Sequence, residues 1–229
     1  MLLPIDADEF MSVVVPLLEK EDPRALAQTV SLRWRPRQLC SLLQHENVDV
    51  RKVAAVTLGF VGDRNVAGYL TRSLRDQDAC VNQMAEHGLW SIWFRSGNSQ
   101  AAMPFREGIA LLGDEAYRDA IMKFQESIGL DPMFAEAHNQ CAIAHFFLSE
   151  WTESIREAQQ TVRLAPCHFG AIAGMGHCYT QLGDLQHALA CYRRAIRINP
   201  RMPGVARAID RLEGRANSSG ESMVDQIYG

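Results

Sequence analysis

The sequence predicts an all-α protein of the α-α superhelix type, a solenoid in which pairs of helices repeat along the chain. Two internal repeats lead to this prediction. Over residues 101–200, small, aromatic and proline residues return three times at a spacing of 34, and a period of this length is typical of stacked helical units. Over residues 49–90, a different pattern returns after 31 residues. We therefore expect two helical arrays, one over residues 1–98 and one over residues 99–213.

The first array is predicted from two related helices. Asp49–Gly59 is followed by Cys80–Trp90, and apolar residues recur between them with an offset of 31: Val50, Ala54 and Leu58 correspond to Val81, Ala85 and Leu89. Polar residues that can cap a helix precede both segments. A shorter apolar helix is expected before each cap, at Pro36–Leu43 and Asn65–Leu74.

Farther upstream, a degenerate first unit is expected. Asp22 and Pro23 suit the cap and first residue of a helix over Arg24–Arg33, because a carboxylate can accept free N–H groups there and proline has none to leave unpaired. Asp6–Lys20 would be the partner of this helix. The array ends at the linker Arg95–Ser99, where the two arrays either stack, as we expect, or hinge.

The second array is predicted to hold three units of two helices. Each unit ends in a proline, which cannot continue a helix; these are Pro132, Pro166 and Pro200. Small side chains that let paired helices approach closely are expected in the column Gly108, Ala142 and Gly176. A second column of larger residues holds Phe124, Ala158 and Tyr192. Turns inside the units are expected at Gly113-Asp114, Ser149-Glu150 and Gly183-Asp184.

These columns resemble the tetratricopeptide repeat family over three full units, at residues 101–132, 135–166 and 169–200. The middle unit departs from the family pattern, because Ala158 stands where the second helix usually has an aromatic residue. Val205–Leu212 carries an apolar stripe and resembles the capping helix that closes such arrays. Residues 214–229 lack periodicity and are expected to be a disordered tail. The first array resembles the short HEAT-type repeats of phycobilin lyases.

The family resemblance implies that the protein is a noncatalytic adaptor, which holds a peptide or helix of another protein in a concave groove. First helices of successive units line that groove, and the matching residues here are Phe105, Arg106, Ile109, Leu112, Asn139, Ile143, Phe146, Phe147, Ala173, His177, Thr180 and Gln181. Asn139 is expected to hydrogen-bond to the bound segment. Chaperone-binding members hold a C-terminal carboxylate with several lysines and arginines. Arg106 is the one basic member of this set, so an apolar or mixed segment is expected in place of an Hsp70 or Hsp90 tail.

Three residues of the middle unit offer an alternative metal-binding function. His138, Cys141 and His145 would share one helix face, as a zinc site requires, but they fall in columns whose other members are packing residues. The sequence has no HExxH or GxSxG motif and no glycine-rich phosphate loop. We expect no metal, no cofactor and no catalysis. The alternative left open is a HEAT-repeat enzyme of the phycobilin-lyase type or a metal-binding protein.

Composition bounds the partners and the compartment. Net charge is −4 and hydrophobic content 47%, and residues 1–98 hold 11 Lys and Arg against 12 Asp and Glu. The basic cluster Arg33–Arg37 is therefore expected to be a solvated helix junction and not a nucleic-acid site. The early apolar run Val13–Leu18 is too short to span a membrane. A cytoplasmic protein with reduced cysteines is expected, and a homo-oligomer stays open. The resemblance of the first array to HEAT-type repeats implies a bacterial origin.

Overall fold

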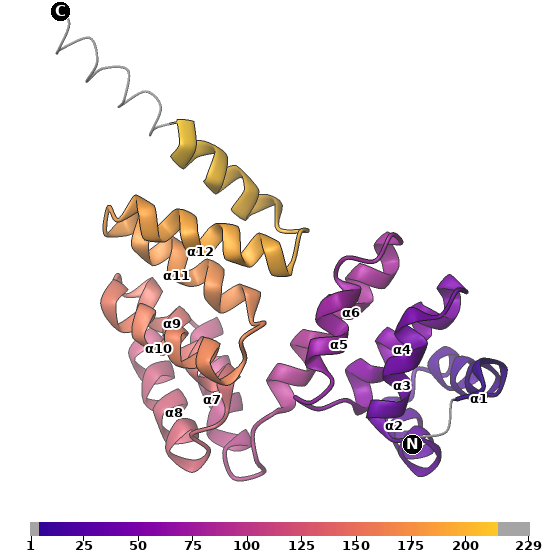
Figure 1. The fold of residues 1–229 in the computed structure, drawn as a ribbon. Helices are drawn as coiled ribbons and strands as arrows, with labels where there is room; N and C mark the ends of the chain where they lie inside the picture. Colours follow the sequence, from indigo (N-terminus) through magenta and orange to yellow (C-terminus); the bar gives the residue numbers. More distant parts are fainter. Residues whose placement is uncertain (1–4, 215–229) are drawn as a thin grey trace, which may run out of the picture. The chain divides into compact units, whose positions relative to one another are not determined.

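The computed structural model describes residues 5–214 (Figure 1). Every element within these residues is a helix, which confirms the predicted all-α superhelical fold class. Contacts between residues divide the chain into two compact units, residues 1–98 and residues 99–229. Across residues 5–214, no helix has the length and apolar character that crossing a lipid bilayer requires.

The first unit is a succession of helices of unequal length. They are α1 (Ala7–Glu19), α2 (Pro23–Arg33), α3 (Pro36–Leu39), the 3₁₀ helix η1 (Cys40–Gln44), α4 (Val48–Val61), α5 (Ala67–Ser73) and α6 (Ala79–Arg95). The expected caps are present: the carboxylate of Asp22 accepts from the N–H groups of Arg24 and Ala25, and the side chains of Asn47 and Asp78 cap α4 and α6 in the same way. The segment expected as one helix at Pro36–Leu43 is divided between α3 and η1.

Helices α4 and α6 pack closely because two glycines face each other. A Cβ atom added to Gly59 would lie 2.9 Å from the Cα atom of Gly88, which is nearer than a carbon contact allows. The C-terminal end of α4 is closed by Arg95, the last residue of α6. Its Nη2 atom donates to the carbonyls of Gly59 (2.8 Å) and Gly62 (3.2 Å), and its Nη1 atom donates to that of Phe60 (2.8 Å).

The second unit contains three helix pairs and a closing helix. The pairs are α7 (Ala102–Gly113) with α8 (Tyr117–Leu130), α9 (Ala135–Phe147) with α10 (Trp151–Leu164), and α11 (Phe169–Gln181) with α12 (Leu185–Ile198). A helix over residues 203–214 follows, where a capping helix was expected. Gly214, assigned to the disordered tail from the sequence, is its last described residue. The rest of that predicted tail lies outside the described residues.

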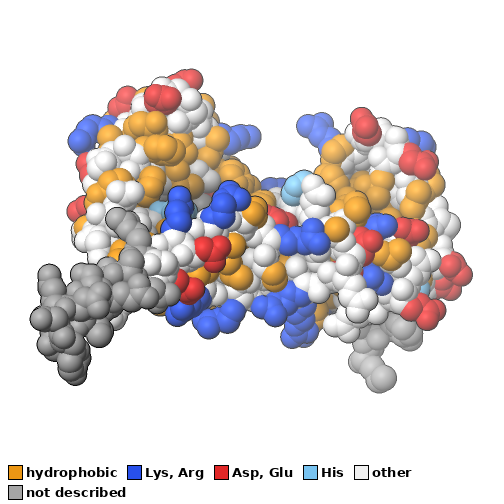
Figure 2. All heavy atoms as spheres, turned by 90° about the horizontal axis from the view of Figure 1, so that it is seen from above, with side chains coloured by type: hydrophobic (Ala, Val, Ile, Leu, Met, Phe, Trp, Pro, Cys, Tyr) orange, Lys and Arg blue, Asp and Glu red, His pale blue; other side chains and the backbone are white. Residues whose placement is uncertain are grey.

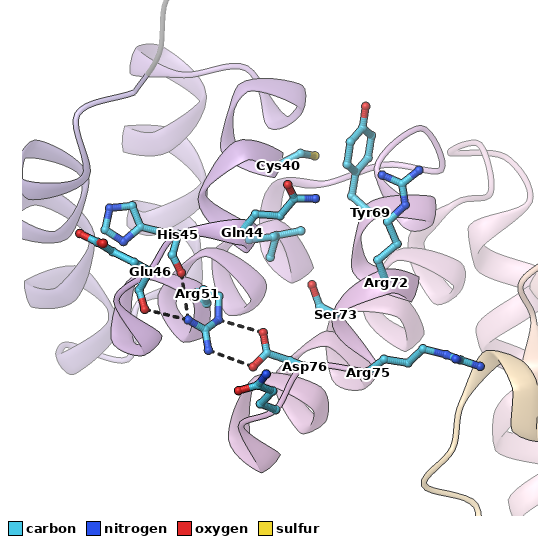
Figure 3. Close-up of a pocket in the computed structure, with 12 residues that line it drawn as sticks. Cys40, Gln44, His45, Glu46, Arg51, Tyr69, Arg72, Ser73, Arg75 and Asp76 are labelled. Atoms are coloured by element: carbon cyan, nitrogen blue, oxygen red, sulfur yellow. Dashed lines mark hydrogen bonds and ion pairs between the residues drawn. The ribbon is translucent and has the colours of Figure 1, made fainter.

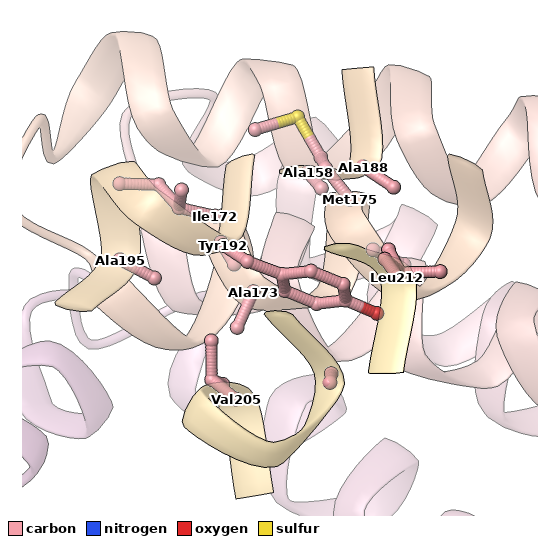
Figure 4. Packing of buried hydrophobic residues seen from close by; sticks show 12 residues of the cluster. Ala158, Ile172, Ala173, Met175, Ala188, Tyr192, Ala195, Val205 and Leu212 are labelled. Atoms are coloured by element: carbon pink, nitrogen blue, oxygen red, sulfur yellow. The ribbon is translucent and has the colours of Figure 1, made fainter. Parts of the chain in front are cut away.

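Packing within the pairs explains the two main columns. A Cβ atom on Gly108 would lie 2.6 Å from the Phe124 ring, and one on Gly176 would lie 2.6 Å from the Tyr192 ring. In the middle pair, Ala142 and Ala158 take these positions and are buried in one cluster. The middle unit therefore has a smaller residue, Ala158, in place of the aromatic ring and a larger one, Ala142, in place of the glycine on the facing helix. Figure 4 shows Tyr192 at the centre of the cluster, among Ile172, Ala173, Val205 and Leu212.

Each pair turns through one residue with a left-handed backbone. The φ angles are 60° at Glu115, 61° at Ser149 and 76° at Gly183, so the 34-residue period extends to the turns. The turn expected at Gly113-Asp114 is confirmed at Asp114 only, because Gly113 ends α7 and Glu115 carries the positive φ. A left-handed backbone brings Cβ too close to the following carbonyl in residues other than glycine.

Replacing Ser149 with glycine is expected to raise the free energy of unfolding by about 0.5–1 kcal/mol, because glycine adopts this backbone without the Cβ contact. Urea denaturation followed by circular dichroism would measure the change. The reciprocal substitution Gly183→Ser is expected to lower stability by a similar amount. Equal stability of all three proteins would show that the strain at these turns is relieved in another way.

Candidate functional site

A concave pocket of about 520 Å³ lies on the second unit, formed by its last three helices and the end of α9. Its lining combines two aromatic rings, an imidazole, polar side chains and one arginine: Phe146, His177, Thr180, Gln181, Tyr192, Ala208, Arg211 and Leu212. Figure 2 shows hydrophobic side chains gathered on the surface of this unit, at the left of the view, with Lys and Arg side chains beside them. Such a mixture suits a ligand that is apolar with a few polar groups.

Three side chains in the pocket are joined by hydrogen bonds. The Tyr192 hydroxyl lies 2.8 Å from Nδ1 of His177 and 3.2 Å from Oγ1 of Thr180, and Thr180 donates to the Gly176 carbonyl at 2.8 Å. Burial, and then the charge of Arg211, lower the pKa of His177. The imidazole is therefore mostly neutral near pH 7. Among the described lining residues, Arg211 is then the group that carries a full charge.

An aromatic row leads from this pocket across all three helix pairs. Tyr117 stacks on Phe147 with ring centroids 5.0 Å apart and planes at 11°. Phe147 is followed by Phe146 at 6.1 Å, by His177 at a further 6.4 Å and by Tyr192 at a further 5.2 Å. Phe147 is 56% exposed, although aromatic side chains of this size are usually buried. The row offers a surface on which an apolar segment could lie.

The predicted groove residues separate into several groups in the structure. Phe146, His177, Thr180 and Gln181 meet in the pocket, and Phe147 lies beside it in the aromatic row. Ile109 and Leu112 are partly buried and pack against the core of the first pair, whereas Arg106 is exposed on α7. Ile143 is partly buried on α9. A role in partner binding stays a prediction for all of them.

Three of the predicted residues point inward instead. Phe105, Asn139 and Ala173 are only 4%, 3% and 5% exposed. The Asn139 amide, expected to face a bound peptide, donates from Nδ2 to Oε1 of Glu136 at 3.0 Å. Its expected orientation is therefore wrong: the side chain satisfies a buried carboxylate of its own helix.

Glu136 is the centre of a buried polar network. Its side chain is fully buried and accepts from Nδ2 of Asn139, from Nε2 of Gln140 at 2.6 Å and from Nε2 of His168 at 2.9 Å. His168 is the N-cap of α11, and its Nδ1 accepts from the Ala171 N–H at 3.0 Å. Since Nδ1 accepts a hydrogen bond, Nε2 is the ring atom that donates to Glu136. The network ties α9 to the start of α11.

The residues of the alternative zinc site are engaged with the protein. Nδ1 of His138 lies 2.7 Å from Glu157, and Nδ1 of His145 lies 2.7 Å from Glu150. Burial raises the pKa of the Cys141 thiol to about 12, which keeps it protonated, whereas a metal binds the thiolate. Within residues 5–214, no group of three or more His, Cys, Asp or Glu side chains is placed to hold a metal ion.

Sequence reasoning missed four lining residues of the pocket, and two of them, Tyr192 and Arg211, bring polar groups into it. Tyr192 was assigned to a packing column, yet its hydroxyl reaches the pocket and holds His177. Arg211 lies in the closing helix, between apolar residues that pack on the array. The signal available for Arg211 was its place one position before Leu212, on a helix expected to cover the last pair. No column could identify it, because the closing helix does not repeat.

Comparison with known proteins gives a consistent result for the second unit. Residues 171–202 match the family model of the tetratricopeptide repeat. The tetratricopeptide domain of Sgt2 from Aspergillus fumigatus has a TM-score of 0.52 at 14% identity, covering 55% of this chain and 84% of that domain. The first such domain of Spaghetti (RPAP3), bound to the HSP90 peptide SRMEEVD, has a TM-score of 0.51 at 18% identity, covering 53% and 97%. The TM-scores show a shared fold.

Two curated relatives match in sequence. A TPR repeat-containing protein of Rhizobium etli is 25% identical over 108 residues, which cover 47% of this chain and 53% of the relative. The small glutamine-rich tetratricopeptide repeat-containing protein 2 of Saccharomyces cerevisiae is 25% identical over 92 residues, covering 40% and 27%. The chain thus spans about half of the first relative and about a quarter of the second. The HEAT-like character of the first unit stays a prediction.

Proposed function

We propose that the protein is a noncatalytic adaptor that captures a segment of another protein in the concave pocket of its second unit, where residues 171–202 match the tetratricopeptide repeat. The observation that carries the proposal is the pocket itself. Aromatic rings, a neutral imidazole, a glutamine amide and the guanidinium of Arg211 converge there. We place this adaptor in the cytoplasm.

The pocket chemistry favours a particular kind of segment. Phe146 and the neighbouring exposed ring of Phe147 would receive an apolar side chain, and buried aromatic contacts supply most of the affinity in such sites. The Gln181 amide can hydrogen-bond to a peptide backbone, while Arg211 can pair with one carboxylate. We therefore propose an apolar segment with a single acidic residue nearby.

The structural neighbour Spaghetti binds an HSP90 peptide, SRMEEVD, which supports a protein partner for this array as well. That peptide carries three acidic side chains and a terminal carboxylate. Here Arg211 is the one Arg or Lys among the described residues that line the pocket. We propose that an acid-rich tail of this kind is not the partner.

Binding is expected to be lost in the double variant Gln181→Ala with Arg211→Glu. Both side chains line the pocket and are exposed, so the fold should persist while the polar contacts vanish and one charge reverses. The measurement is affinity capture from host lysate with identification by mass spectrometry. A retained protein should be depleted by about tenfold or more with this variant, and labelled SRMEEVD should show no saturable binding to the wild type.

A matched control is available on α12 and the closing helix. Gln186 on α12 and Arg207 on the closing helix are exposed and lie outside the pocket lining. The variant Gln186→Ala with Arg207→Glu makes the same chemical change and should retain the captured protein. If both variants retain it, or if both lose it, the pocket is not the binding site. Tight binding of SRMEEVD would overturn the assignment of an apolar segment.

A further inference from the structure

The pocket of the second unit lies next to the place where the described chain ends. Two of its lining residues, Arg211 and Leu212, belong to the closing helix, whose last described residue is Gly214. A helix rises by about 1.5 Å per residue, so Gly214 lies roughly 4.5 Å farther along the helix axis than Arg211. The chain that follows Gly214 therefore starts about one helical turn from the pocket lining.

The pocket combines hydrophobic surface with one cation. Arg211 is the one Arg or Lys among the described lining residues, and none of these residues is acidic. The Phe146 ring lines the pocket, and the exposed ring of Phe147 lies beside it. A carboxylate brought into the pocket would meet a guanidinium and no repelling acid among these residues. The best occupant is thus a hydrophobic segment with one carboxylate.

The chain carries a segment with this chemistry a few residues after Gly214. Residues 223–228, here called the docking segment, read Met-Val-Asp-Gln-Ile-Tyr. They hold four large hydrophobic side chains around one carboxylate, that of Asp225. The docking segment lies beyond the described part of the chain. Residues 1–4, at the other end, read Met-Leu-Leu-Pro and bring no acid.

The connection from the closing helix to the docking segment is long enough to reach the pocket. Residues 215–222 are eight in number, and eight residues span up to roughly 27 Å, several times the rise from Arg211 to Gly214. A ligand joined to its site by a short connector has an effective concentration on the order of 1 mM. A contact with a Kd of about 0.1 mM would then fill the pocket about nine-tenths of the time.

The cleft of the first unit does not offer the same match. It has a volume of about 510 Å³, lies between η1 and α5, and has mostly polar and charged lining side chains. Arg51 in this cleft forms two parallel hydrogen bonds to the Asp76 carboxylate, at 2.8 and 3.0 Å (Figure 3). The charge of Arg51 is thus balanced, and Glu46 in the same lining would repel an acidic segment.

We propose that the docking segment occupies the pocket of its own chain, with the Asp225 carboxylate at Arg211 and its hydrophobic side chains against Phe146 and Phe147. This inference rests on the proposed adaptor function, because it takes the same pocket as the binding site. It adds a means of regulation. A partner must displace the docking segment before it binds, so weakly binding hydrophobic segments are excluded.

Fluorescence anisotropy of the full chain measures this competition with a labelled peptide of residues 221–229, amidated at its C-terminus. The full-length variant Met223→Ser with Ile227→Ser should bind the peptide about tenfold more tightly than the wild type, because its own segment no longer competes. The control Ser218→Ala with Ser219→Ala changes two residues of the connector and should bind the peptide as the wild type does.

Charge reversal at Arg211 tests whether the peptide occupies this pocket. In the Met223/Ile227 variant, the further change Arg211→Glu should weaken peptide binding by about tenfold or more. Arg207→Glu, on the same helix but outside the pocket lining, should leave binding unchanged. An Asp225→Arg peptide should recover binding to the Arg211→Glu protein, because the two charges are exchanged. Thermal melts should match throughout, since Arg207 and Arg211 are both exposed.

Three results would overturn the proposal: equal peptide affinity of the wild type and the Met223/Ile227 variant, no binding to either, or binding that survives Arg211→Glu. A wild-type dimer in sedimentation that the Met223/Ile227 variant does not form would also overturn it, because the segment would then enter a second copy.

Failure of this inference is distinguishable from failure of the adaptor function. If the Gln181/Arg211 variant loses a captured protein while the peptide does not bind, the adaptor function stands and the docking segment is excluded. If the peptide binds at Arg211 while capture does not depend on the pocket, the docking segment is supported and the adaptor function is contradicted.

Discussion

Replacing Glu136 with alanine is expected to lower the free energy of unfolding by about 3 kcal/mol, because several buried donors lose their acceptor at once. Asn139, Gln140 and His168 all donate to this carboxylate, which is fully buried. Alanine supplies no acceptor, and water cannot reach the site without opening the contact between α9 and α11. Urea denaturation followed by circular dichroism measures the loss.

A graded series separates the network from the loss of a charge. Glu136→Gln keeps one carbonyl oxygen for Asn139 and Gln140 but turns an amide N–H₂ toward the donating Nε2 of His168, so its cost should be smaller, about 1–2 kcal/mol. Glu126→Ala removes an exposed carboxylate of α8 whose partner is Lys123, and its cost should stay below about 1 kcal/mol. A Glu136→Ala protein as stable as the Glu126→Ala control would contradict the assigned network.

The second large effect concerns Gly176. A methyl group at this position would lie 2.6 Å from the Tyr192 ring, which is 1% exposed and held by its hydroxyl to His177. The ring is packed within the buried cluster of the last pair, and its hydroxyl borders the pocket. Overpacking costs about 1–3 kcal/mol, and the better helix propensity of alanine offsets about 1 kcal/mol of this. We expect Gly176→Ala to be destabilised by up to about 2 kcal/mol and to bind a partner of the pocket more weakly.

Gly174, on the same helix, provides the matched control. A Cβ atom there would meet nothing within 4 Å, so Gly174→Ala should gain the helix propensity and be stabilised by up to about 1 kcal/mol. Two identical substitutions two residues apart should thus shift the melting temperature in opposite directions. A stabilised Gly176→Ala protein would show that α11 and α12 can separate at little cost.

The period of the sequence predicted most of the second unit, because repetition reports on packing. A residue that recurs every 34 positions meets the same neighbours in each pair, so the glycine and aromatic columns indicated which side chains face each other. In the middle unit, Ala158 replaces the aromatic residue and Ala142 replaces the glycine, and the two are buried in one cluster. The turns were harder to place. Gly113-Asp114 has the composition of a turn, but the chain passes through the left-handed region at Glu115.

The candidate site was predicted less completely. The repeat period shows on which face of a helix a residue lies, but it does not show how deeply that residue is buried. Asn139 occupies a groove-facing position by register, yet Glu136 one turn earlier is buried and draws the amide inward. That depends on His168 in the next unit, 32 residues away, and no local pattern reports it. Arg211 was missed because it lies in the closing helix, which has no repeated counterpart in the chain.

The guanidinium of Arg95 sets a limit on how the chain can be divided. Its three hydrogen bonds to carbonyls at the end of α4 belong to the first unit, although the residue stands at the beginning of the stretch that looks like a linker. An expression fragment that stops at Phe94 would leave the α4 carbonyls without this donor. Any fragment intended to carry the first unit alone must therefore include Arg95.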